Sequence, residues 1–323
     1  MFREFRLVFC RFTIIAEEVG ARLPALKGSI FYDQCFQESM YHNFCKKKNM
    51  ICENCSSNPI CPYPFMYKNI PAWKSQQFGS VAPFTWKPPL EKKTVYMKGE
   101  KVQYSLTLIG NAYKHLKKMI NVLEGYLIKK EHSFGKLMLK KVVTENPFTK
   151  EQEIVYSSKT AFNEDALVFI HGNEIESWAK QNMLASGLLL TFLTPTCFKY
   201  KNECVKEVHF YYLVRELLLR VQTLYYFYHN RQELNINYQK YLRGAEEVQK
   251  VSDQSRFITA DKSTWANDGL LGKIKYTGKL EEYLPLIKLG ELVHIGEKAV
   301  LGFGRYRFTT QGLAIRNPKL SSK

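Results

Sequence analysis

The sequence predicts an α+β protein with two tandem domains, each with the order strand, helix, strand, strand, helix, strand. Two observations carry this prediction. Strand-like and helix-like patterns follow in that order up to about residue 180, and a similar series begins again after it. The length of 323 residues also favours two domains, because single domains typically hold ~150 residues. Hydrophobic residues make up 45% of the chain, which is enough to build packed cores.

The first domain, residues 1–180, contains two helix patterns among its strand patterns. Residues 4–15 are rich in Phe, Val and Ile and are apolar on both faces, which predicts the central strand of a covered sheet. In residues 28–44 apolar side chains recur every four positions and predict a helix. This stripe consists of Tyr32, Phe36, Met40 and Phe44. The other elements are predicted as strands at 79–89, 101–110 and 135–143 and a helix at 111–130.

The second domain, residues 181–323, repeats the theme with one gap. A strand pattern at 186–195 stops at Pro195, and a long helix pattern follows at 206–230. Residues 231–268 are polar and irregular, so no element is assigned to them. The last elements are predicted as a strand at 269–278, a helix at 282–296 and a strand at 299–309. The order βαββαβ is that of ferredoxin-like or RRM-like units.

Positive charge dominates the chain. Its 47 Lys and Arg residues exceed its 30 Asp and Glu residues, so the net charge is +17 and the pI is about 9.4. Such an excess favours a polyanionic partner, most commonly nucleic acid, with an anionic membrane as the competitor. We expect no membrane partner, because no run reaches about 18 apolar residues. The longest candidate, Phe210 to Tyr228, is interrupted by Arg215, Glu216 and Arg220.

The N-terminal residues could be taken for a signal sequence until their charges are counted. Apolar runs there are interrupted by Arg3, Glu4, Arg6 and Arg11. We therefore expect a cytoplasmic protein. In a reducing compartment its eight cysteines should be thiols or metal ligands rather than disulfides.

Four cysteines grouped in residues 45–61 predict a structural zinc site. Cys52 and Cys55 form a CxxC step that can hold one metal from a short turn, and Cys45 and Cys61 complete four soft ligands. The alternative is a loop of unmetallated cysteines. A redox CxxC fits less well, because this step lies in a loop rather than at the start of a helix. The scattered cysteines are Cys10, Cys35, Cys197 and Cys204.

The C-terminal segment "LGELVHIGEKAVLGFGRYRF", residues 289–308, resembles the glycine-rich loop of the RAMP superfamily, in particular of the CRISPR precursor-RNA processing endoribonucleases. Further segments occur in the order that this family shows, so the resemblance covers most of the chain. They are "LPALKGSIF", the cysteine loop ending "CPYPFMY", "YSLTLIGNAYKHL", "LLLTFLTPT" and "GLLGKIKYTG".

This resemblance implies two ferredoxin-like domains that bind a CRISPR repeat RNA and cut it once to release guide RNAs. The implied chemistry is attack of the ribose 2′-OH on the adjacent phosphorus, with the 5′-oxygen leaving and no catalytic metal. It needs a base, an acid and cations around the phosphorane. The products would be a 2′,3′-cyclic or 3′-phosphate and a 5′-OH. Other subunits of CRISPR-associated complexes are further candidate partners.

The glycine-rich loop, residues 294–305, is the predicted RNA contact. Its glycines would let backbone amides approach phosphate, and its basic side chains would neutralise the strand. The residues assigned to RNA binding are Lys27, Gly296, Lys298, Gly302, Gly304, Arg305 and Arg307. The alternative is that Gly302 and Gly304 only allow tight packing of a strand on a helix.

Two of the seven histidines are candidate catalysts. His42 lies off the apolar stripe of its helix, so it should be exposed, and Glu38 one turn earlier would favour its protonated form. The resemblance agrees, because the family usually places a catalytic histidine near its first helix. His294 stands where the glycine-rich loop begins, and its alternative role is that of a helix C-cap.

Two other functions stay open at this point. A non-catalytic RNA-binding scaffold subunit of a CRISPR interference complex would show the same glycine-rich loop. A zinc-containing DNA-binding regulator would bind duplex DNA rather than repeat RNA. The fold alone does not choose among them.

Overall fold

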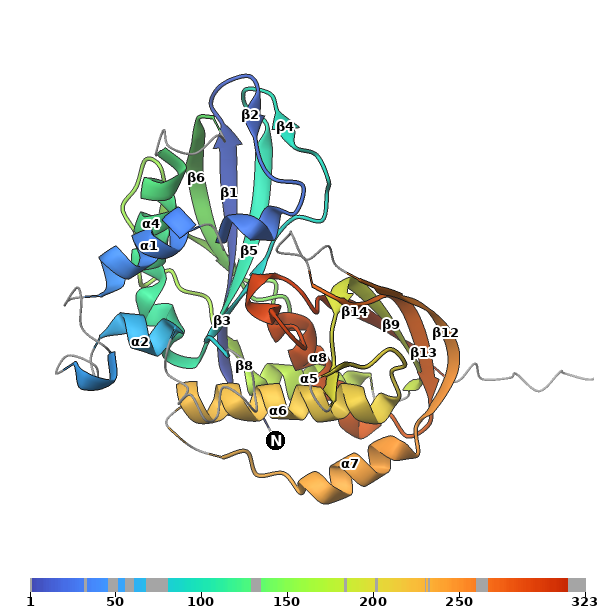
Figure 1. Ribbon diagram of the computed structural model, residues 1–323. Coiled ribbons are helices and arrows are strands. Elements are labelled where there is room, and N and C mark those ends of the chain that lie inside the picture. The colour runs from blue at the N-terminus through green and yellow to red at the C-terminus, as the bar shows by residue number, and fades with distance from the viewer. Residues whose placement is uncertain are drawn as a thin grey trace, which may run out of the picture.

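The structure, a computed structural model, contains two large antiparallel sheets with helices packed against them, and two small two-stranded sheets, β2-β4 and β10-β11 (Figure 1). It describes residues 2–31, 34–45, 52–55, 61–67, 81–128, 135–182, 185–200, 203–229, 231, 233–259 and 267–312. Tyr32, from the predicted stripe, lies outside these ranges. Within them, none of the helices combines the length and the apolar character that a membrane crossing needs.

The first unit has the predicted βαββαβ order. Its sheet runs β3-β5-β1-β6-β7, and β8 pairs with the start of β1. The strands β3, β5, β1 and β6 follow the ferredoxin-like arrangement. The elements are β1 (Arg6–Ala16), β2 (Ala21–Arg22), η1 (Lys27–Phe31), α1 (Gln34–Phe44), η2 (Cys52–Asn54), α2 (Pro62–Tyr67), β3 (Phe84–Lys87), β4 (Val95–Tyr96), β5 (Lys101–Ile109), η4 (Gly110–His115), α4 (Leu116–Ile128), β6 (Leu137–Glu145), β7 (Gln152–Ser157) and β8 (Ile170–His171).

The second unit has the sheet order β12-β13-β9-β14, again ferredoxin-like. The unassigned residues 231–268 contain α7 and β12, and β12 supplies the strand that the sequence pattern did not reveal. It is an edge strand without a fully buried residue, so its sequence shows no apolar alternation. The elements are α5 (Gly172–Gln181), β9 (Ala185–Thr196), β10 (Lys199–Tyr200), β11 (Glu203–Cys204), α6 (Phe210–Tyr228), α7 (Tyr238–Glu246), β12 (Gln249–Ile258), β13 (Gly269–Thr277), η5 (Glu281–Tyr283), α8 (Leu284–Val293), η6 (Ala299–Leu301) and β14 (Tyr306–Gly312).

The central strand β1 is fully covered on one face only. Val8, Cys10 and Phe12 are buried in the core that α1 and α4 complete. Phe9 and Arg11 point to the other face and are half-buried. The prediction of a central strand is therefore confirmed, whereas the prediction of a sheet covered on both faces is only partly correct.

Each unit contributes residues to the core of the other. Phe2 and Phe5, at the start of the chain, belong to the core of the second unit, where the Phe5 ring stacks on Tyr225 of α6 with centroids 5.9 Å apart. Leu301 and Phe303, from the glycine-rich segment (residues 294–305), belong to the core of the first unit. The two units therefore pack as one body through their chain ends.

Side chains from three other elements hold the C-terminal end of α8. The last carbonyls of a helix have no partner within it. Thr107 on β5 donates a hydrogen bond to the carbonyl of Leu292 at 3.0 Å. Thr85 on β3 donates to the carbonyl of Val293 at 3.0 Å, and Arg220 on α6 donates to the same oxygen at 2.9 and 2.7 Å. The glycine-rich segment begins at the next residue, so its start is fixed against the first sheet.

Removing these hydroxyls should lower stability unequally. Thr107→Val should cost about 1–3 kcal/mol of unfolding free energy, because the carbonyl of Leu292 loses its cross-unit donor. Thr85→Val should cost about 1 kcal/mol, since Arg220 still serves the carbonyl of Val293. Urea unfolding measures both values.

The control is Thr13→Val on β1. Thr13 is also buried, but the donors to the carbonyls of Leu292 and Val293 are Thr107, Thr85 and Arg220, not Thr13. Its substitution should therefore change the unfolding free energy by less than about 0.5 kcal/mol. Equal losses in all three variants would contradict the role assigned to the two threonines.

Candidate functional site

The glycine-rich segment, residues 294–305, forms a series of tight turns packed against β3 and η1. A Cβ at Gly304 would lie 1.6 Å from the carbonyl oxygen of Ile295, and one at Gly302 would lie 2.4 Å from the Pro88 ring. Both glycines also have positive φ, so packing and backbone conformation both require glycine. Positive φ angles occur at His294 (56°), Gly296 (78°), Lys298 (53°), Gly302 (97°) and Gly304 (64°).

The amides of Gly302 and Gly304 are used inside the protein. Gly302 donates to the carbonyl of Ala299 and Gly304 to that of Pro195, each at 3.1 Å. A backbone N–H that is already bonded internally is not available to a phosphate. The structure therefore supports the packing role for these two glycines instead of the predicted RNA contact.

Basic side chains from both units converge beside this segment. Burial, followed by the charges of Arg305 and Arg307, lowers the pKa of Lys87 to about 8. Lys288 on α8 lowers this pKa further, and Glu291 opposes the shift. Arg305 is half-buried and donates to the carbonyl of Pro88 at 3.1 Å, whereas Arg307 is exposed.

The positive charge continues across the open face of the second sheet. Arg307 on β14 and Lys273 on β13 both pair with Thr191 on β9, one from each side, and both side chains are exposed. Directly paired residues share a face, so the two cations flank Thr191 on one face. Lys275 lies two residues from Lys273 on that face. We call Lys87, Lys273, Lys275, Arg305 and Arg307 the basic surface.

Lys298 and Lys27 differ sharply in exposure. Lys298 is exposed in the glycine-rich segment. Lys27 is only 1% exposed, and its ammonium donates to the carbonyls of Glu91 and Lys93 at 2.6 and 2.8 Å. Burial lowers its pKa, and Glu91 opposes the shift. The predicted RNA contact at Lys27 is therefore wrong, because this side chain joins η1 to the segment before β4.

His294 is the C-cap residue of α8 and is completely buried. Burial, together with the nearby charges of Lys87 and Arg305, lowers the pKa of this imidazole well below its usual range. The ring is therefore neutral near pH 7 and has no access to solvent. The structure favours the C-cap position for His294 and argues against its predicted catalytic role.

His42 is exposed near the end of α1, as predicted. Its ring lies 5.7 Å from that of Tyr41, which packs against Tyr63 of α2 with centroids 5.1 Å apart. By contrast, His115 and His229 lie among packed side chains, and burial lowers the pKa of each to about 4. Among these histidines, His42 is the one that an RNA strand can reach, and its catalytic role stays a prediction.

None of the four grouped cysteines is in a disulfide. Cys45 directly follows α1, and the thiol of Cys61 donates to the carbonyl of Phe44 at 3.6 Å. The amide of Cys55 donates to the carbonyl of Cys52 at 3.2 Å and closes a short turn. Within the described ranges, no three of these sulfur atoms lie within 4.8 Å of one another. The donor chemistry suits zinc, but the metal site stays a prediction.

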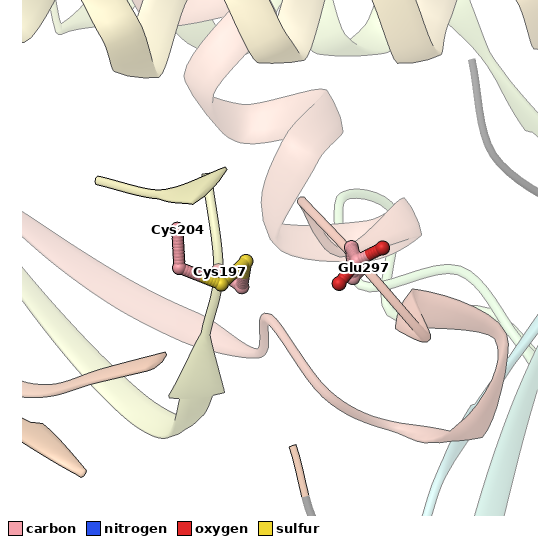
Figure 2. Close-up of side chains that lie close together, drawn as sticks. All are labelled: Cys197, Cys204 and Glu297. Atoms are coloured by element: carbon pink, nitrogen blue, oxygen red, sulfur yellow. A yellow bond between two sulfur atoms is a disulfide. The ribbon is translucent and has the colours of Figure 1, made fainter. Parts of the chain in front are cut away.

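A disulfide joins Cys197 and Cys204, whose Cα atoms are 5.2 Å apart (Figure 2). The prediction that the cysteines are thiols or metal ligands is therefore wrong for this pair. The antiparallel pairing of β10 with β11 returns the chain beside the end of β9, a contact that cysteine spacing alone does not reveal. The cytoplasmic location stays a prediction.

Two family models match consecutive parts of the chain. One, described as an N-terminal domain, matches residues 5–167. The other, the CRISPR-associated endoribonuclease Cas6, matches residues 190–306, which include the whole glycine-rich segment. Residues 190–306 are therefore similar to the Cas6 family. None of the curated proteins compared with this chain matches it.

Solved Cas6 structures share the fold at low sequence identity. The chain is similar to the partial Cas6-RT-Cas1–Cas2 complex, with a TM-score of 0.59, 11% identity, and coverage of 95% of this chain and 46% of that chain. For Thermus thermophilus Cas6 (TTHB231) the values are 0.51, 13%, 94% and 99%. For the product complex of that protein they are 0.53, 12%, 94% and 99%. The chain thus spans less than half of the first, larger protein.

Sequence reasoning missed Lys273 and Lys275 of the basic surface, although the sequence carried a usable signal for both. Lys273 and Lys275 alternate with Ile274 and Tyr276 within a predicted strand, so they could have been assigned to one open face. Lys87 had no such signal. Its position beside Arg305 depends on how the two units pack.

The packing role of Gly304 predicts a large loss of stability on substitution. Gly304→Ala should lower the unfolding free energy by about 2–5 kcal/mol, because strain at positive φ adds to the clash with the carbonyl of Ile295. Gly20→Ala is the matched control. Gly20 also has positive φ, but nothing lies within 4 Å of the place that a Cβ would take there, so about 1–2 kcal/mol is expected. Similar losses in thermal unfolding of both variants would refute the packing role.

Proposed function

We propose that this chain is a metal-independent endoribonuclease that cleaves CRISPR repeat RNA and releases guide RNAs. The observation that carries the proposal is the match of residues 190–306 to the Cas6 endoribonuclease model. The RNA strand is bound by the basic surface. Its ribose 2′-OH attacks the adjacent phosphorus, and the 5′-oxygen leaves.

The basic surface supports an RNA partner because its charge is concentrated. Its cations come from β3, β13, β14 and the glycine-rich segment, and the charges of Arg305 and Arg307 add to burial in lowering the pKa of Lys87. A polyanion relieves this repulsion, since each phosphate supplies counter-charge in addition to that of Glu291. Lys298 extends the charge along the glycine-rich segment.

Proton transfer is assigned to His42. An imidazole with a pKa near neutrality can give a proton to the leaving 5′-oxygen or take one from the 2′-OH. His42 is exposed on α1, so a bound strand can reach it without opening a core. The lysines at 46–48, which could stabilise the phosphorane, lie outside the described residues.

Other CRISPR-associated subunits are proposed as partners. The solved complex that shares this fold contains Cas6 together with RT, Cas1 and Cas2, according to its name. The chain described above would occupy the Cas6 part of such an assembly.

His42→Ala should slow repeat cleavage by roughly 10²- to 10⁴-fold while leaving RNA affinity and folding intact, because a general acid or base is lost from an exposed helix face. Single-turnover rates with enzyme in excess isolate the chemical step. His209→Ala, at the exposed N-cap of α6, is the matched control and should cleave at the parent rate.

Cleavage by the parent protein must proceed in a chelator and yield a 5′-OH with a cyclic or 3′-phosphate. A 3′-OH product, or strict dependence on a divalent ion, would exclude the mechanism. RNA binding without any cleavage by the parent protein would instead identify a scaffold. If His42→Ala cleaves the repeat at the parent rate, a group other than His42 must transfer the proton.

The basic surface predicts a change in salt dependence. Arg307→Ala combined with Lys273→Ala should weaken repeat RNA binding, and the slope of log affinity against log salt should flatten by about 0.7 for each lost phosphate contact. Lys240→Ala, on the exposed side of α7, is the control for a change in net charge. If the salt-dependence slope changes equally in the double variant and in Lys240→Ala, the RNA binds elsewhere on the protein.

We also propose that Cys45, Cys52, Cys55 and Cys61 hold one structural zinc ion. The position of Cys45 and Cys61 at the end of α1 and the short turn between Cys52 and Cys55 support the proposal. The ion would order the loop and would take no part in cleavage.

Elemental analysis of protein that was purified without chelator, and in which the Cys197–Cys204 disulfide is intact, should find about one zinc per chain. Cys52→Ser together with Cys55→Ser should remove it, because only two soft ligands then remain. The cleavage rate of the folded variant should stay close to that of the parent. Zinc-free parent protein would contradict the proposal.

A further inference from the structure

A second group of potential metal ligands lies near the start of the glycine-rich segment. It contains Cys197, just after β9, Cys204, in β11, and Glu297, in the glycine-rich segment (Figure 2). Their ligand atoms all lie within 4.8 Å of one another. Within the described part of the chain, this is the one group of three or more such residues that meets this distance.

The backbone holds these three residues together independently of the disulfide. The amide of Glu297 donates to the carbonyl of Cys197 at 3.3 Å. A Cβ at Gly296 would lie 2.3 Å from the same carbonyl oxygen, so the glycine permits the close approach. Cys204 is placed by the pairing of β10 with β11, where it lies opposite Lys199. Breaking the bond between the sulfurs therefore leaves all three ligands in place.

We propose that Cys197, Cys204 and Glu297 form a redox-controlled site for a zinc-type divalent cation. In the oxidised chain the two sulfurs are bonded to each other and cannot act as thiolate ligands. A dithiol reductant gives two electrons and two protons to the disulfide, which yields two cysteine thiols and the oxidised reductant. The cation then displaces the two thiol protons to solvent and binds both thiolates and the carboxylate of Glu297.

The chemistry of the three donors suits a borderline-soft cation. Thiolates bind zinc at ~2.3 Å and carboxylates at ~2.0–2.2 Å, and three protein ligands leave a fourth position for water. Tetrahedral binding needs the sulfurs to separate to about 3.7 Å, which side-chain rotation can provide. Cys197 is fully buried, whereas Cys204 and Glu297 are half-buried, so an ion can enter from the side of Glu297.

Lys199 is the group that the cation must displace. Its ammonium is ion-paired with the carboxylate of Glu297; the Lys199 side chain is 48% exposed and that of Glu297 is 36% exposed. Exposed ion pairs contribute little to stability, so a divalent cation can replace the ammonium at small cost. The metal would then connect Cys204 of β11 directly to Glu297 of the glycine-rich segment.

Cobalt titration tests the site in a background that lacks the CxxC step, Cys52→Ser with Cys55→Ser. Co²⁺ reports thiolate ligation through its charge-transfer absorption. After reduction by a phosphine, the background chain should bind about one Co²⁺, and Zn²⁺ should displace it. The same chain with its disulfide intact should show no thiolate absorption. Equal cobalt absorption in the oxidised and reduced chains would overturn the proposal.

Side-chain variants in this background separate the ligands. Cys197→Ser with Cys204→Ser should abolish the absorption, and Glu297→Gln should weaken Co²⁺ binding at least 10-fold. Glu203→Gln, an exposed acid in the same hairpin, is the matched control and should bind as the background does. An unchanged affinity in Glu297→Gln would overturn the three-ligand site.

Alkylation of the parent protein gives a test that does not depend on the folding of a variant. In the reduced chain, Zn²⁺ should protect Cys204, which is half-buried, from a maleimide, as peptide mass spectrometry can measure. Equal labelling of Cys204 with and without Zn²⁺ would overturn the proposal. Cys10, which is buried away from the site in the first core, should stay unlabelled in both samples and so reports that the chain remains folded.

Discussion

The capture of the α8 carbonyls by Thr85, Thr107 and Arg220 is the interaction on which the arrangement of the two units depends. A helix end buried between two sheets would leave carbonyls unsatisfied unless another element supplied donors. Here the first sheet and α6 supply them. The donors set where α8 ends, and the glycine-rich segment leaves from that point toward β3 and η1.

The same contact explains the concentration of positive charge. Because α8 ends against β3, Lys87 at the end of β3 lies beside Arg305 and Arg307. Burial and repulsion lower the pKa of Lys87 to about 8, and burial lowers that of Arg305 to about 10. A folded protein that keeps such cations close together carries an electrostatic cost, and this cost is lowered when a polyanion binds. The basic surface is therefore suited to binding rather than to stability.

The glycine-rich segment shows why one pattern can have two explanations. Its glycines were predicted to approach phosphate, yet Gly302 and Gly304 approach Pro88 and Ile295 instead, and their amides bond within the protein. Both functions require the absence of a Cβ, so composition cannot separate them. Exposure separates the flanking side chains: Lys298 and Arg307 face solvent, whereas His294 is buried.

The sequence by itself determined the βαββαβ order of the first unit, the second unit except for one strand, the apolar stripe of α1 and the exposure of His42, because apolar periodicity records which face of an element is buried. The sequence pattern did not predict the edge strand β12, since a strand without a buried face shows no apolar alternation. Tertiary structure alone decided the burial of Lys27 and His294, the disulfide between Cys197 and Cys204, and the position of Lys87. These depend on contacts between segments far apart in the chain, and local patterns do not encode the distance between such segments.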